Sequence, residues 1–270
     1  MRKALIWLDE HLLFILTGFL LAFIPLYPKI PLADILPGYI VRVRLEDIFI
    51  ALTLIIWIIQ LWRKKVSFGP NPLTRPVLAY LTVGALSMIS AVLITQTVPF
   101  EFLHISKMAL HFFRRIEYFS LFFVFYSTIK SIRQVKIYLL ILLLTIVGIT
   151  VYGFGQKYLY WYAFSTMNRE FSKGWRLILT QHARVMSTFG GHYDLAAYSM
   201  GALLVLWSLY FSLKQKIWKM ITLTTLAGLF WILILTVSRT SFIAYIAGIT
   251  VLFVFWMFKE GFRWAFPRWI

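Results

Sequence analysis

The chain has 270 residues, of which 61% are hydrophobic and only 14% are charged, and its formal net charge is +17. A soluble domain of this length is not so apolar, so the composition indicates a helical membrane protein with several spans. Cysteine is absent, which excludes disulfide bonds and a thiolate nucleophile. The basic charge indicates anchoring at a membrane, because no soluble basic face is predicted that would bind nucleic acid.

Apolar stretches near spanning length recur from end to end and predict an all-α bundle of about eight transmembrane helices. No small-residue cleavage site follows the first stretch, so it is a span and not a removable signal peptide. No β-strand pattern is expected. We expect one membrane domain over residues 1–270, with a long outer loop over 155–194. The predicted spans cover residues 12–27, 48–62, 77–98, 109–128, 137–154, 195–213, 220–237 and 241–258.

Short basic connections set the orientation of these spans. With the N-terminus inside, 15 of the 27 lysines and arginines lie in inner segments, nearly all in short connections, as the positive-inside rule requires. Both termini are then cytoplasmic and the number of spans is even.

Arg239 is the only charged residue in the apolar run from Met220 to Phe258. As one helix, these 39 residues would be about 58 Å long, whereas a bilayer core is about 30 Å thick. The run is therefore expected to fold back on itself at Arg239. A cation at a tight turn between two spans is a candidate functional residue, and the alternative is a turn residue that reaches the lipid headgroups.

Two further charged groups lie on the predicted outer side. The segment from Arg42 to Asp47 precedes the second span, and its alternative interpretation is an interfacial hairpin with self-paired charges. Residues 116–128 alone are too short to cross a membrane, so the fourth span must begin earlier. Arg114, Arg115 and Glu117 are therefore expected to lie at or within the membrane. They are expected to face other helices or a wet cavity. The alternative is an internal pair of Arg114 with Glu117, with Arg115 extended outward.

The outer loop contains an aromatic run at residues 158–164, which is typical of a membrane interface, and then a second arginine segment. In that segment Arg184 is followed by Ser187, Thr188 and two glycines, just before a predicted helix. Hydroxyls and backbone N–H groups near a helix start suit a phosphate or another oxyanion. The alternative is an ordinary loop in which Asp194 caps the following helix.

Four segments form a series along the chain. TVSRTSFIA contains Arg239, RVMSTFGGHYDLAAY begins at Arg184, RLEDIFIAL precedes the second span, and RRIEYFSLFFVF lies in the fourth. These segments resemble the O-antigen ligase and O-antigen polymerase superfamily, and the similarity runs in the same order through essentially the whole chain. The two arginine motifs are moderately specific, and the other two are weak on their own.

The resemblance implies an integral-membrane glycosyltransferase that works without a metal or another cofactor at the outer face of the bacterial cytoplasmic membrane, in cell-surface polysaccharide biosynthesis. Such proteins transfer a glycan from undecaprenyl diphosphate to lipid A core, to another glycan repeat or to a protein. Arg184 and Arg239 match the family's functional arginines and are expected to bind the diphosphate. The candidate accessory residues are Arg44, Arg115, His182 and His192.

The chain departs from the family after the eighth span. Typical members continue with another span pair and a large outer loop, and that loop carries a histidine that activates the acceptor hydroxyl. This sequence has no counterpart of that histidine, so the resemblance predicts that it is the N-terminal part of a longer family member. On the outer side, His182 and His192 remain as imidazoles that can serve as a base.

Two functions of other classes compete with this one. A non-enzymatic transporter of anions or lipid-linked glycans would also place arginines in a membrane cavity, but the inverted repeats that favour it are not visible. A membrane scaffold without a small ligand would leave Arg184 and Arg239 unexplained.

The predicted topology is testable with reporter fusions. Fusions at Lys65, Ser131, Gln215 and Lys259 should report a cytoplasmic location, and a fusion at Lys173 should report an external one, because the short basic connections are retained inside. An external signal at Lys65 or Gln215 would contradict the topology.

Overall fold

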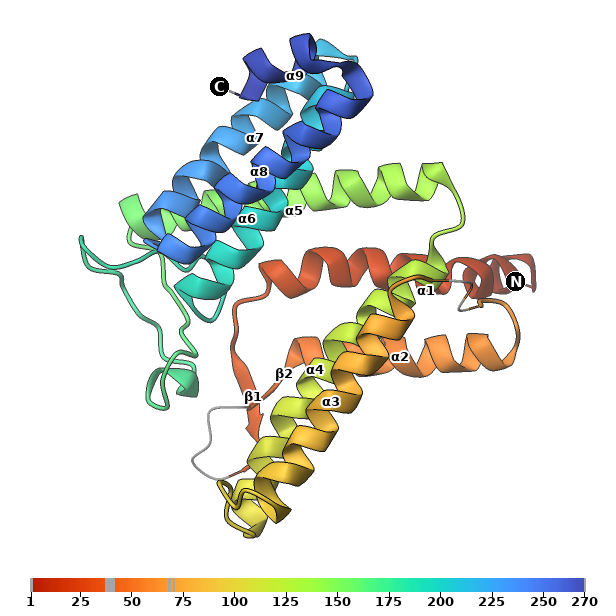
Figure 1. Ribbon diagram of the computed structural model, residues 1–270, viewed down its shortest axis with the longest axis vertical. Helices are drawn as coiled ribbons and strands as arrows, with labels where there is room; N and C mark the ends of the chain where they lie inside the picture. Colours follow the sequence, from red (N-terminus) through yellow and green to blue (C-terminus); the bar gives the residue numbers. More distant parts are fainter. Residues whose placement is uncertain (1, 37–41, 68, 70, 270) are drawn as a thin grey trace. The chain divides into compact units, whose positions relative to one another are not determined.

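The computed structural model describes residues 2–36, 42–67, 69 and 71–269. Its long elements are all helical, which confirms the predicted all-α class. The elements in chain order are α1 (Arg2–Leu26), β1 (Pro31–Asp34), β2 (Arg42–Arg44), α2 (Leu45–Trp62), α3 (Thr74–Leu93), α4 (Phe102–Thr128), α5 (Ile132–Tyr158), the short 3-10 helix η1 (Phe171–Lys173), α6 (His192–Ser212), α7 (Lys216–Leu235), α8 (Arg239–Glu260) and α9 (Phe262–Trp269) (Figure 1).

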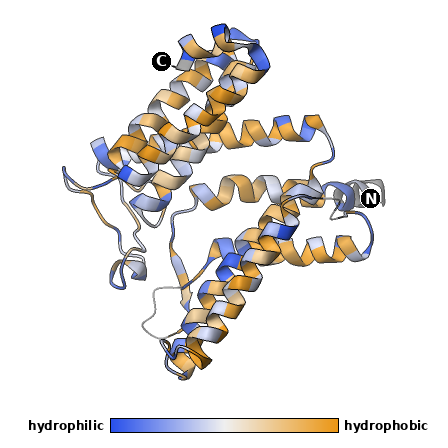
Figure 2. Ribbon diagram, viewed as in Figure 1, coloured by the Kyte–Doolittle hydropathy of each residue, from blue (hydrophilic) through white to orange (hydrophobic). Residues whose placement is uncertain are grey.

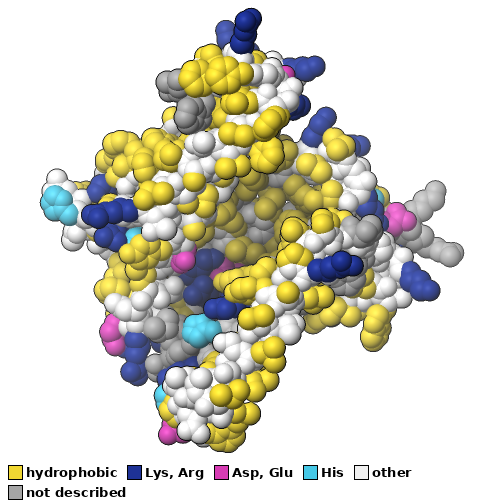
Figure 3. All heavy atoms as spheres, in the orientation of Figure 1, with side chains coloured by type: hydrophobic (Ala, Val, Ile, Leu, Met, Phe, Trp, Pro, Cys, Tyr) yellow, Lys and Arg dark blue, Asp and Glu magenta, His cyan; other side chains and the backbone are white. Residues whose placement is uncertain are grey.

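Within the described part of the chain, seven helices are long and apolar enough to cross a membrane: α1 from Asp9 onward, α2, α3, α5, α6, α7 and α8. Figure 2 shows that hydrophobic residues dominate these helices. The helix α4 also has 27 residues, but Arg114, Arg115 and Glu117 lie near its middle. In Figure 3, hydrophobic side chains cover much of the visible surface of the long helices. These features indicate an integral membrane protein.

The structure divides into two compact units. Unit 1 comprises Met1–Leu20 and Leu32–Tyr138, and unit 2 comprises Leu21–Pro31 and Leu139–Ile270. The helices α1 and α5 therefore each contribute residues to both units.

In unit 1, α3 and α4 run antiparallel and side by side, with Gly84 facing the ring of Phe112 (Figure 1). The helix α2 runs alongside α4 in the same direction. An Asp47–Arg114 ion pair joins the start of α2 to the middle of α4. Nearer the C-terminal ends of both helices, the Trp57 indole donates to the Ser127 hydroxyl at 2.8 Å. The buried core of this unit consists of Leu13, Trp57, Val66 and Val124.

Unit 2 is built on α6, α7 and α8, which lie side by side (Figure 1). Leucines from α6 and α7 interdigitate with residues of α5 and α8 in its core; they include Leu203, Leu206, Leu229 and Leu233, all at most 1% exposed. The loop between α5 and α6 covers a second core cluster, in which Val185 and Ala163 are fully buried. The loop is therefore a packed part of the unit.

Two features differ from the sequence-based expectation. The expected absence of strands is wrong, because β1 and β2 pair in a small sheet. Strands of four and three residues are too short to give a recognisable alternation of polar and apolar positions. The short helix α9 was also not predicted. It begins after Gly261, whose φ of 93° ends α8, and Trp264 packs against Trp256.

The close approach of α5 to the loop that follows it gives a stability prediction. A Cβ on Gly155 would lie 2.2 Å from the ring of Trp161, so the indole would have to move. Gly155→Ala should therefore lower the free energy of unfolding by about 1–3 kcal/mol, measured from thermal unfolding in detergent.

Gly201→Ala is the matched control, since Gly201 also lies in a helix but has open space around its Cβ position. This change should be neutral or stabilising by up to about 1 kcal/mol. Equal destabilisation by the two substitutions would show that the Trp161 contact is not the cause.

Candidate functional site

Arg239 lies at the turn between α7 and α8. The helix α7 ends at Leu235 and α8 begins at Arg239, which confirms that the long apolar run folds back at this residue. Ser238 caps α8, its hydroxyl accepting from the Ser241 N–H at 3.5 Å. Val237 has a φ of 53°, a left-handed conformation that a β-branched residue rarely adopts. The turn thus holds an exposed arginine at a helix N-terminus through a strained backbone.

Arg184 is held at the N-terminus of α6. Its Nη1 lies 2.9 Å from Nε2 of His192 and donates to the Tyr193 hydroxyl at 3.4 Å, and these are the first two residues of α6. His192 is itself buried, at 7% exposure. The arginine is therefore oriented by the helix that follows it, while its side chain stays exposed.

One backbone hydrogen bond joins the two arginine segments. The Val185 N–H donates to the Leu235 carbonyl at 3.2 Å, so the residue after Arg184 is fixed to the last turn of α7, four positions before Arg239. The two segments therefore lie next to each other at the level of the backbone. Each segment also contains a residue with positive φ, Ser187 at 49° and Val237 at 53°.

The sequence suggested that the hydroxyls of Ser187 and Thr188 could bind an anion. In the structure, both hydroxyls already donate their hydrogen bonds to backbone carbonyls. Ser187 Oγ donates to the Ile149 carbonyl at 2.7 Å, and Thr188 Oγ1 donates to the Pro25 carbonyl. Both side chains are buried. They anchor the loop to α5 and α1, because a hydroxyl in an apolar interior needs a hydrogen-bond partner and a backbone carbonyl supplies one.

Gln156 is a second anchor that sequence reasoning missed. It is fully buried in the last turns of α5, and its Nε2 donates to the Ser187 carbonyl at 2.8 Å and to the Tyr162 carbonyl at 3.2 Å. One amide thereby fixes both ends of the outer loop. The only sequence signal for this role is a glutamine at the end of an otherwise apolar helix.

His182 and Asp194 are the two remaining residues of this region that the sequence singled out. His182 is exposed on the loop. Asp194 is not the cap of α6, because Gly191 occupies that position and Asp194 lies in the first turn. The predicted outer loop 155–194 is also shorter than expected, since α5 extends to Tyr158 and α6 begins at His192.

An apolar groove lies beside Arg239. Its volume is about 590 Å³, and the arginine is its one charged lining residue among those that the structure describes. The lining comes from the last turn of α7, the turn and the first turns of α8; it consists of Leu233, Ile234, Val237, Ser238, Arg239, Phe242 and Ile243. An apolar groove with a cation in its lining suits an amphiphile with an anionic head.

The candidate accessory arginines belong to unit 1. Arg44 is paired with Glu46 at 3.2 Å, and its backbone N–H donates to Asp47 at 2.9 Å. Together with the Arg42–Asp34 pair at 3.1 Å, this matches the hairpin with self-paired charges that the sequence offered as the alternative.

The α4 arginines have separate partners. The Arg114–Glu117 pair that the sequence offered as the alternative is present at 3.7 Å, and Arg114 also binds Asp47 of α2. Arg115 donates to the Tyr80 hydroxyl of α3 at 3.0 Å.

Comparison with protein-family models, with curated proteins and with solved structures finds no match to this chain.

The double anchor at Gln156 gives a testable prediction about the loop. Gln156→Leu would leave the buried Ser187 carbonyl without this donor, at a cost of about 1–3 kcal/mol. The Tyr162 carbonyl would keep its second donor, the Tyr152 hydroxyl at 2.8 Å. The loop should then open more often, and trypsin should cleave after Lys173 and Arg176 faster than in the wild type, as followed by gel electrophoresis.

Gln181→Leu serves as the control, because Gln181 is exposed on the same loop. It should leave the cleavage rate unchanged. An unchanged rate in Gln156→Leu would mean that this amide does not hold the loop.

Proposed function

We propose that this chain binds the diphosphate of a polyprenyl-linked glycan through Arg184 and Arg239. The reaction class that fits this ligand is transfer of the glycan to an acceptor, as in the O-antigen ligase and polymerase superfamily that the sequence resembles. The observation that carries the proposal is the Val185–Leu235 hydrogen bond, which fixes the two arginine segments to each other. Both side chains are exposed and thus available to a ligand.

Electrostatics support an anionic ligand at this place. Each arginine lies at the N-terminus of a helix, where the helix dipole is positive and disfavours a cation by about 0.3–1 kcal/mol. A bound anion reverses this effect, because it interacts favourably with the guanidinium and with the helix end together. Arginine suits a diphosphate in particular, since its planar fork donates two hydrogen bonds to phosphate oxygens.

The groove beside Arg239 supports an amphiphilic ligand. Leu233, Phe242 and Ile243 line it next to the guanidinium. A polyprenyl chain would lie along these side chains while its diphosphate reached the arginine. Stabilising a departing diphosphate is an electrostatic task that fixed cations perform without a metal ion.

The two histidines differ in the roles that they suit. His192 is buried and bonded to Arg184, so it suits a positioning role for the guanidinium. His182 is exposed on the same loop and has room to reach an acceptor hydroxyl.

The topology that accompanies this proposal has eight spans, with α4 as the fourth, both termini in the cytoplasm, and the arginine turns at the outer face of the bacterial cytoplasmic membrane. The parallel direction of α2 and α4 supports it, because two spans separated by one other span must run in the same direction. The acceptor in this setting is a lipid or a glycan.

Binding of undecaprenyl diphosphate to the full chain in detergent micelles tests the proposal. Arg184→Ala and Arg239→Ala should each weaken binding about tenfold or more, as expected for the loss of a charge-assisted pair of hydrogen bonds. Lysine at either position should restore binding only in part, because a point charge does not reproduce the fork. Undecaprenyl monophosphate should bind more weakly than the diphosphate.

Arg176→Ala is the matched control. Arg176 is another exposed arginine of the outer loop, and its guanidinium lies over the ring of Tyr162 at 5.6 Å. This variant should bind like the wild type. Wild-type binding by Arg239→Ala, or an equal loss in Arg176→Ala, would contradict the proposed site.

A further inference from the structure

Arg114 and Arg115 are neighbours in the middle of α4, but their surroundings differ. Arg114 is compensated by Asp47 and Glu117. Arg115 donates to the Tyr80 hydroxyl at 3.0 Å, with its guanidinium 5.9 Å from the centre of that ring. Among the described residues, no carboxylate lies within 4.0 Å of its nitrogens. A guanidinium among apolar helices without a counter-charge is unfavourable, which makes it a candidate ligand-binding residue.

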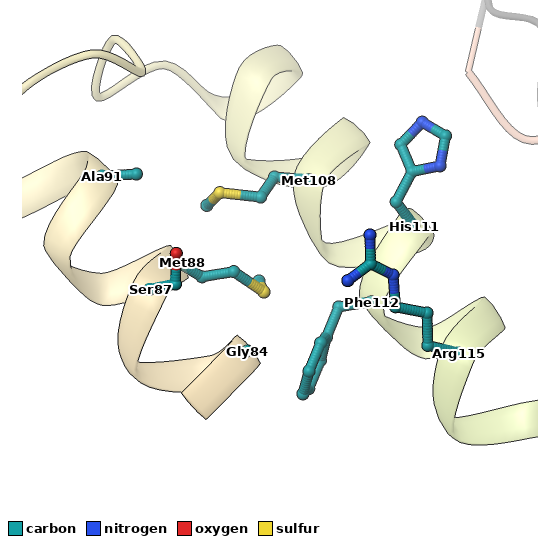
Figure 4. A pocket seen from close by; sticks show the side chains of 8 residues that line it. All are labelled: Gly84, Ser87, Met88, Ala91, Met108, His111, Phe112 and Arg115. Carbon is teal, nitrogen blue, oxygen red and sulfur yellow. The ribbon is translucent and has the colours of Figure 1, made fainter. Parts of the chain in front are cut away.

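A cavity lies directly beside Arg115, between α3 and α4. Its volume is about 380 Å³. Figure 4 shows Met88 of α3 and Met108 of α4 projecting into the space between the helices, with Phe112 and the Arg115 guanidinium on the α4 side. The cavity is thus mostly apolar, and its polar lining consists of the Ser87 hydroxyl, the His111 imidazole and the Arg115 guanidinium. Arg115 is exposed, so the cavity opens at the surface of unit 1.

Size and chemistry define the class of ligand. The volume equals that of about a dozen water molecules in the liquid, which is enough for a lipid head and its first methylene groups but not for a whole lipid. One guanidinium compensates one negative charge. Methionine side chains are flexible and adapt to the shape of an apolar stem. These properties suit an amphiphile whose head carries a single negative charge.

We propose that the α3–α4 cavity binds the head of a monoanionic amphiphile. The anionic group of the ligand binds the Arg115 guanidinium, and its apolar stem lies between Met88 and Met108. The shared chemistry is an anionic oxygen group on an apolar chain, which either a phosphodiester lipid or a fatty carboxylate supplies. This site consists of unit 1 residues only and does not depend on Arg184 or Arg239.

The test uses the full chain in phosphatidylcholine nanodiscs, with dioleoylphosphatidylglycerol or oleate added as the probe. Native mass spectrometry counts the bound probe, and titration gives its dissociation constant. Arg115→Gln should weaken binding of the better probe about tenfold or more, because the charge-assisted hydrogen bonds are lost. The better of the two probes identifies the head as a phosphodiester or a carboxylate.

Two variants separate the cavity from general surface charge. Arg263→Gln removes an equal charge from the exposed surface of α9 and should leave binding unchanged. Ala91→Phe keeps every charge but fills the cavity, so it should weaken binding as Arg115→Gln does. It also keeps the proposal testable if Arg115→Gln does not fold.

Three results would overturn the proposal. They are wild-type affinity in Ala91→Phe, equal losses in Arg115→Gln and Arg263→Gln, and displacement of the probe by millimolar inorganic phosphate. The last result would mean that the site takes a free anion and not an amphiphile.

Discussion

Charge compensation is the constraint on which the rest of this structure depends. The helices are apolar, and a charge among them is unfavourable unless a partner of opposite charge or a good hydrogen-bond acceptor lies within reach. Asp9 on α1 meets Arg63 and Lys65 after α2, and Asp47 on α2 meets Arg114 on α4. These pairs link α1 to the end of α2, and α2 to α4. Arginines left outside such pairs are therefore the places where a ligand is expected to complete the compensation.

The same constraint applies to the polar groups of the loop in unit 2. Ser187, Thr188 and Gln156 are buried, and each donates to a backbone carbonyl. Their hydrogen bonds stabilise a loop whose backbone is strained at Ser187. Because the loop is fixed in this way, Arg184 remains exposed at a defined place next to α6. The buried polar residues thus position the site, and the exposed ones are available to bind.

Much of the fold was predictable because it depends on the local apolar pattern. The length of each apolar run predicts a helix, and Arg239 marks the turn between α7 and α8 because it interrupts a run too long for one span. The pairing of Arg114 with Glu117 was also predictable, since residues three apart share a helix face. The strands β1 and β2 and the helix α9 were missed, because each is too short to establish a period.

The candidate site was predictable only in part. The arginines are visible in the sequence as charges in apolar surroundings. The roles of Ser187 and Thr188 were not predictable, because a hydroxyl suits an anion and a backbone carbonyl equally well. The distant partners of these residues, Ile149 and Pro25, are defined only by the tertiary packing. Gln156 and the Val185–Leu235 hydrogen bond depend on the same packing.

The long-range ion pairs of unit 1 also have a consistent direction along the chain. Asp9 precedes Arg63 and Lys65, and Asp47 precedes Arg114, so in each pair the acid is synthesised first. A protein made from its N-terminus inserts its earlier helices before its later ones. When α4 is inserted, Arg114 then meets an acid on α2 that is already in place. The order of charges in the chain therefore favours assembly of unit 1 helix by helix during synthesis.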